Sequence, residues 1–152
     1  MKKNLIPLAV FCAAGAAAAF PGTVDMARRD GVVARTLSVS NWKVNQRGVP
    51  SFDFRFSQTG GGCDYARSGH AVAGFEEEDG KAELEIYSGQ DDNGREGPQM
   101  LTLYAHDNAV VFSTPVQQNR ALRMSFQDEQ MRKAVPKKCG YTERGSSIQF
   151  RK

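Results

Sequence analysis

Short runs in which apolar and polar residues alternate recur along almost the whole chain. The clearest holds Phe52, Phe54 and Phe56, which alternate with Asp53 and Arg55. Because successive side chains of a β-strand point to opposite faces, a period of two predicts a strand with one buried face. Seven or eight such runs, separated by clusters of Gly, Asn and Asp, are typical of an antiparallel sandwich or barrel. We therefore predict an all-β fold, an antiparallel β-sandwich or barrel of seven to eight short strands.

Three local signals refine this prediction. The alternation changes phase at Asn41, so that Trp42 and Val44 share a face, as in a bulged strand. The pair Asp79-Gly80 between two alternating runs predicts a tight hairpin turn, and residues 106–108 predict a second one.

The segment 89–98 is rich in Gly, Asp and Asn and is the longest predicted loop. Because exposed loops often carry contact residues, we take Asp91, Asp92, Asn93 and Arg95 as a candidate binding loop.

The start of the chain has the layout of a secretory signal peptide. Lys2 and Lys3 precede a short apolar stretch, which runs into small residues up to Ala19. We expect residues 1–19 to be removed by cleavage after Ala18 or Ala19 and the protein to be secreted. No later segment is apolar enough to span a bilayer, so no membrane span is expected.

A dibasic pair, Arg28-Arg29, follows in a segment without periodicity. It is the kind of site at which eukaryotic processing proteases cut, so residues 20–29 are a possible pro-segment. The remaining residues, 30–152, are then a single β domain.

Cysteine usage points to one disulfide bond. Cys12 lies in the predicted leader, which leaves Cys63 and Cys139 in the mature chain. Two cysteines in an oxidising compartment most simply form one bridge. The alternative, a metal site or reactive thiol pair, lacks supporting histidines or CxxC spacing.

The net charge of the predicted mature chain indicates which classes of partner it can bind. The segment up to Arg29 holds four of the 20 basic residues and one of the 17 acidic ones, so 16 of each remain. A chain near neutrality lacks the basic footprint of a nucleic-acid-binding protein. Residues 76–96 are acidic and residues 132–152 basic, which indicates either a dipolar molecule or charges that pair across the sheet.

No catalytic motif stands out, but one enzyme hypothesis is concrete. A secreted ribonuclease would need an acid, a base and a phosphate clamp. The residues that could supply them are His70 or His106, Glu83 or Glu85, and Arg55 or Arg123. Each of these also fits an ordinary solvent-facing position of a strand or turn.

The segment that begins at Asp91 does not match an EF-hand calcium loop. Arg95 and Thr102 fall where calcium ligands are required, so we expect no metal or cofactor.

The chain has one tryptophan, Trp42, and four tyrosines, and these aromatic residues could form a platform for a glycan. Core packing of Trp42 beside Phe52 is the simpler interpretation.

A family resemblance is carried by the stretches 39–44 and 51–56 followed by Gly62-Cys63. They resemble small fungal secreted proteins, including the β-barrel family of the major Alternaria allergen and its plant-defence-eliciting relatives. The resemblance implies a non-enzymatic protein of the apoplast that binds a host component or is perceived by plant immunity.

We therefore expect a monomeric effector or elicitor that binds a host protein or glycan. Two alternatives come from other classes: an inhibitor of a host hydrolase such as lysozyme, and the secreted ribonuclease.

Overall fold

The computed structural model describes residues 22–90, 93–116, 121–127, 139 and 146–151. The predicted leader, including Ala19, lies outside these residues, as do Asp91 and Asp92. In the described part of the chain no helix is long and apolar enough to cross a membrane. The described strands are β1 (Val24–Asp30), β2 (Val33–Val44), β3 (Pro50–Thr59), β4 (Tyr65–Ala73), β5 (Phe75–Glu78), β6 (Lys81–Leu84), β7 (Ile86–Gln90), β8 (Glu96–Ala105), β9 (Val110–Pro115), β10 (Ala121–Phe126) and β11 (Ser146–Arg151).

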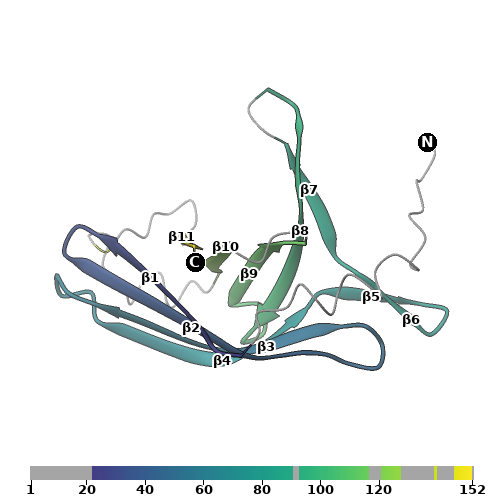
Figure 1. Ribbon diagram of the computed structural model, residues 1–152, viewed down its shortest axis with the longest axis horizontal. Helices are drawn as coiled ribbons and strands as arrows, with labels where there is room; N and C mark the ends of the chain where they lie inside the picture. Colours follow the sequence, from purple (N-terminus) through teal and green to yellow (C-terminus); the bar gives the residue numbers. More distant parts are fainter. Residues whose placement is uncertain (1–21, 91–92, 117–120, 128–138, 140–145, 152) are drawn as a thin grey trace.

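Eight of these strands follow one another through a single antiparallel sheet in the order β1-β2-β3-β4-β8-β9-β10-β11. The sheet curls so that β1 approaches β11, where the Arg28 guanidinium donates to the Gln149 carbonyl at 3.3 Å. This confirms the predicted all-β fold, as a nearly closed barrel. Two hairpins leave its body: β7 pairs only with β8, and β5 and β6 form a separate two-stranded sheet (Figure 1).

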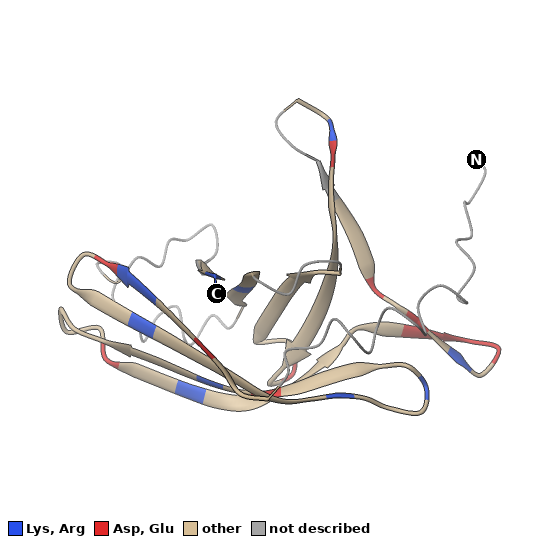
Figure 2. Cartoon of the chain, in the orientation of Figure 1, with Lys and Arg blue, Asp and Glu red and all other residues tan. Residues whose placement is uncertain are grey.

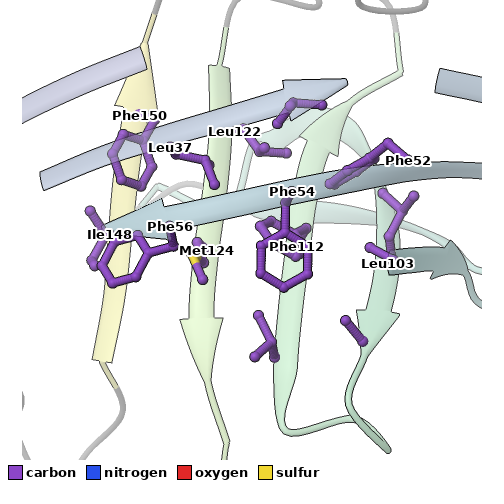
Figure 3. Packing of buried hydrophobic residues seen from close by; sticks show 14 of the residues in the cluster. Leu37, Phe52, Phe54, Phe56, Leu103, Phe112, Leu122, Met124, Ile148 and Phe150 are labelled. Carbon is purple, nitrogen blue, oxygen red and sulfur yellow. The ribbon is translucent and has the colours of Figure 1, made fainter. Parts of the chain in front are cut away.

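The alternation in the sequence sorts side chains between the barrel interior and its outer face. Phe52, Phe54 and Phe56 of β3 are almost fully buried, and they lie across the strands from β8 to β11 (Figure 3). Phe54 meets Phe112 edge to face, with ring centroids 4.8 Å apart. Phe56 meets Phe126 in the same way at 5.5 Å. The interior is therefore filled by interlocking aromatic rings, a favourable arrangement for such side chains.

The predicted local features are found. The β2–β3 register shifts between Ser40 and Lys43, which is the expected bulge. Asp79 and Gly80 both have positive φ and connect β5 to β6, as a two-residue hairpin turn requires. Residues 106–108 form the turn between β8 and β9.

The segment before Asp30 differs from the prediction. Residues Val24–Asp30 are not irregular but form β1, which pairs with β2 along its whole length. Arg28 and Arg29 lie opposite Arg35 and Ala34 in this ladder. A protease needs an extended, accessible segment, so removal of residues 20–29 from the folded protein would first require β1 to detach. Cleavage at the dibasic pair remains a prediction, but the sheet itself starts before Asp30.

The predicted disulfide joins Cys63 and Cys139, whose Cα atoms are 5.6 Å apart. Two inward-facing polar side chains tie this bridge to the sheet. Arg35 donates to the Cys139 carbonyl at 2.7 Å and to the Gln58 side chain at 2.8 Å. Gln58 in turn donates to the Cys63 carbonyl at 2.7 Å. The Asp30 carboxylate completes the network by pairing with the Arg35 guanidinium.

Candidate functional site

The β5–β6 hairpin carries a cluster of charged side chains, most of them acidic. Its outer part holds one basic residue, Lys81, and stands away from the barrel body (Figure 2). Its acidic residues are Glu76, Glu77, Glu78, Asp79 and Glu83. Glu76 lies directly opposite Glu83 in the ladder. Like charges directly opposite each other destabilise a strand pair, and an isolated two-stranded hairpin is already marginal. Glu78 lies opposite Lys81 and forms an opposite-charge pair, so the Glu76–Glu83 pair is the one like-charge pair of the described ladder.

Apolar contacts hold the base of the hairpin. Phe75 and Leu84 lie opposite each other and pack against the barrel core, and Ala82 is buried. The loop between β2 and β3 braces the hairpin from one side. Arg47 of this loop lies 5.2 Å from the centre of the Phe75 ring and pairs with Glu77 at 2.5 Å. The hairpin thus has an anchored base and an acidic outer part.

The junction of the hairpin with the barrel depends on a close approach at Gly74. The Glu85 amide donates to the Gly74 carbonyl at 2.8 Å, and the Tyr104 hydroxyl donates to the Glu85 carboxylate at 2.7 Å. This hydrogen bond, with burial, raises the pKa of Tyr104. A Cβ at Gly74 would overlap with the Glu85 carboxylate, so a larger residue would displace this pair.

The exposed loop predicted at residues 89–98 is shorter in the structure. Residues 89–90 belong to β7 and residues 96–98 to β8, and these two strands extend past the barrel as a second hairpin (Figure 1). Asn93 and Arg95 are exposed at the end of this hairpin. The binding role of the candidate loop remains a prediction.

A polar cluster occupies the outer face of β2, β3 and β4. The Asn41 amide donates to one oxygen of Asp53 at 2.7 Å, and His70 Nδ1 lies 2.7 Å from the other. The hydrogen bonds from Asn41 and His70 hold the pKa of Asp53 below its ordinary value, with a smaller contribution from the positive charge of Lys43. Sequence patterns placed Asp53 and His70 on strands but could not show that they meet, since that depends on the β3–β4 register.

We predict that the Asp53 pKa lies below the ordinary value of an aspartate and rises toward that value in Asn41→Ala and His70→Ala. Because the folded pKa is lower than the unfolded one, the ionised cluster stabilises the fold above the unfolded pKa. This contribution is lost as the pH falls through the folded pKa. A carbon-detected NMR titration of the Asp53 carboxyl measures this pKa. The same Asp53 pKa in the wild type and in both variants would contradict the assigned contacts.

The ribonuclease residues are not brought together as a complete set in the described structure, although Arg55 and His70 lie on one face of the neighbouring strands β3 and β4. His70 contacts Asp53, whereas Glu85 contacts Tyr104. His106 lies in the turn after β8, where its Nε2 donates to the Ser68 carbonyl. Glu83 lies in the hairpin, Arg55 on β3, and Arg123 on β10 beside Gln149.

The aromatic residues also have separate environments. Trp42 stacks on Phe52 at 5.8 Å, which supports the core-packing interpretation. Tyr65 packs against Phe56, and Tyr87 is half exposed and contacts Ser113. The described aromatic side chains do not gather on one platform.

Comparison with known proteins gives no match, either among protein-family models, among curated proteins or among solved structures.

Proposed function

We propose that this chain is a secreted, non-enzymatic protein that binds a host component and is of the effector or elicitor type. The observation that carries the proposal is the β5–β6 hairpin, which places Glu76 opposite Glu83 outside the barrel. A projecting acidic hairpin complements a cationic surface, so the proposed partner is a basic host protein.

The charge of the hairpin gives a prediction in which stability and binding change in opposite directions. Glu83→Lys creates an opposite-charge pair with Glu76 and is expected to stabilise the protein by about 0.2 to 1 kcal/mol. The same change is expected to weaken binding to a cationic partner at least tenfold, since it reverses a charge at the contact. Urea unfolding measures the first effect and partner titration the second.

Infiltration of the purified protein into plant leaves tests the elicitor role. The wild-type protein is expected to trigger an oxidative burst, and Glu83→Lys a weaker one at equal concentration. Asp107→Lys, which makes the same charge change in the turn after β8, is the matched control and should act like the wild type. A burst that Glu83→Lys and Asp107→Lys reduce equally would contradict a role for the hairpin.

The acidic hairpin also favours a second candidate, inhibition of a basic host hydrolase such as lysozyme. A narrow acidic hairpin can enter the substrate cleft of such an enzyme and block it. A lysozyme activity assay with increasing amounts of wild-type protein tests this candidate. Inhibition by the wild type that Glu83→Lys lacks would support it, and full lysozyme activity at saturating protein would end it.

A further inference from the structure

The outer face of β2, β3 and β4 carries two adjacent rows of polar side chains, on the side of the sheet opposite the buried phenylalanines. One row runs Ser38–Arg55–Ser68 across the three strands. The next runs Ser40–Asp53–His70. Side chains that lie opposite each other on one face of neighbouring strands have Cβ atoms about 5 Å apart, so each row forms a compact group.

A strained residue supports the second row. Asn41 lies in the β2 bulge with φ of 53°, in the left-handed region that L-residues rarely adopt. In this conformation its side-chain amide reaches Asp53. Bulges often re-aim side chains near functional sites, and strained residues concentrate at such sites.

The contacts from Asn41 to Asp53 and from Asp53 to His70 orient an imidazole. Since both Asp53 oxygens accept hydrogen bonds, His70 Nδ1 carries the proton in this contact and Nε2 lies on the far side of the ring. The His70 and Asp53 side chains are 53% and 45% exposed. Exposed ion pairs contribute little to stability, so the main effect of this arrangement is to fix the direction of Nε2.

Arg55 provides the second donor group. It is exposed and has no ion-pair or side-chain hydrogen-bond partner among the described residues. Ser38 and Ser68 flank it on the same face, and Lys43 is close enough to lower the pKa of Asp53. A guanidinium binds tetrahedral oxyanions with two parallel hydrogen bonds, and neighbouring hydroxyls add further donors.

We propose that this face binds a sulfate or phosphate ester group, with Arg55 as the bidentate donor and His70 as a second, oriented donor in its protonated form. Asn41 and Asp53 act as positioning residues. The predicted mature chain has balanced charge, so the ligand is a small anionic group rather than a nucleic acid. This site is separate from the acidic hairpin and does not depend on its function.

The test is an NMR titration of the full mature protein at about pH 6 with three probes: a sulfated oligosaccharide, its desulfated form, and inositol hexakisphosphate. Binding is expected to shift the amide signals of Ser38, Arg55, Ser68 and His70. Arg55→Gln is expected to lower the affinity about tenfold, as the loss of a charge-assisted contact does. The control Arg123→Gln makes the same charge change on β10 and should leave the affinity unchanged.

A second variant and the choice of probe also test the proposal. Asn41→Gly removes the amide while glycine tolerates the positive φ, so binding should weaken while the amide signals outside this face stay those of the folded protein. Binding of only the sulfated or only the phosphorylated probe at these residues supports the site and identifies the ester. Equal loss of affinity in Arg55→Gln and Arg123→Gln, or no shifts on this face with any probe, would overturn it.

Discussion

Replacement of both disulfide cysteines, in Cys63→Ala/Cys139→Ala, is expected to lower the free energy of unfolding by about 3 to 5 kcal/mol. The bridge joins positions separated by 76 residues, and a cross-link across so long a loop restricts the unfolded chain strongly. It also fixes Cys139, whose neighbours on both sides lie outside the described residues, against the barrel. Because a domain of this size is commonly stable by only 5 to 15 kcal/mol, the loss is a large share.

Urea unfolding of the oxidised wild type, the reduced wild type and the double variant measures this effect. The reduced wild type and the double variant should unfold at the same urea concentration, which is lower than that of the oxidised wild type. If the double variant were as stable as the oxidised wild type, the bridge would not contribute as proposed.

Loss of the buried Arg35 guanidinium is expected to cost about 3 kcal/mol. Arg35→Met keeps much of the aliphatic volume but removes the hydrogen bonds that Arg35 donates to the Gln58 side chain and to the Cys139 carbonyl. Buried polar groups without partners cost about 1 to 3 kcal/mol each. Arg123→Met removes an exposed arginine from β10 and should change stability by no more than about 0.5 kcal/mol.

The effects of Arg35 and of the disulfide should not add. Arg35 and Gln58 both donate to carbonyls of the bridged cysteines, so they belong to one network with the bridge. A double-mutant cycle between Arg35→Met and the cysteine pair is expected to show a coupling of about 0.5 to 3 kcal/mol. Strict additivity would mean that Arg35 and the bridge stabilise the fold independently.

Much of the fold could be predicted because its signals are local. The alternation around Phe54 gives the buried face of β3 without knowledge of its partners. The turn at Asp79-Gly80 depends on two residues with positive φ, and the disulfide follows from a count of cysteines. These features do not require knowledge of which strands pair.

The parts that could not be predicted depend on long-range pairing. β1 contains only two buried apolar residues, Val24 and Met26, and gains its order from the β2 ladder. The Asp53–His70 contact depends on the register of β3 and β4. A signal for the buried network was present: Arg35 and Gln58 occupy the inward phase of their strands, where apolar residues are expected. Polar residues in that phase mark buried hydrogen-bond networks.

The most direct test of the account compares three proteins, each immobilised and exposed to extracellular fluid of the host. They are the wild type, Glu76→Gln/Glu83→Gln in the hairpin, and the control Asp25→Asn/Asp107→Asn, which removes the same charge elsewhere. Quantitative mass spectrometry of the fractions eluted by rising salt measures what each retains. We expect the wild type and the control to retain the same basic proteins and the hairpin variant to retain at least tenfold less. Equal retention by all three proteins would contradict binding through the β5–β6 hairpin.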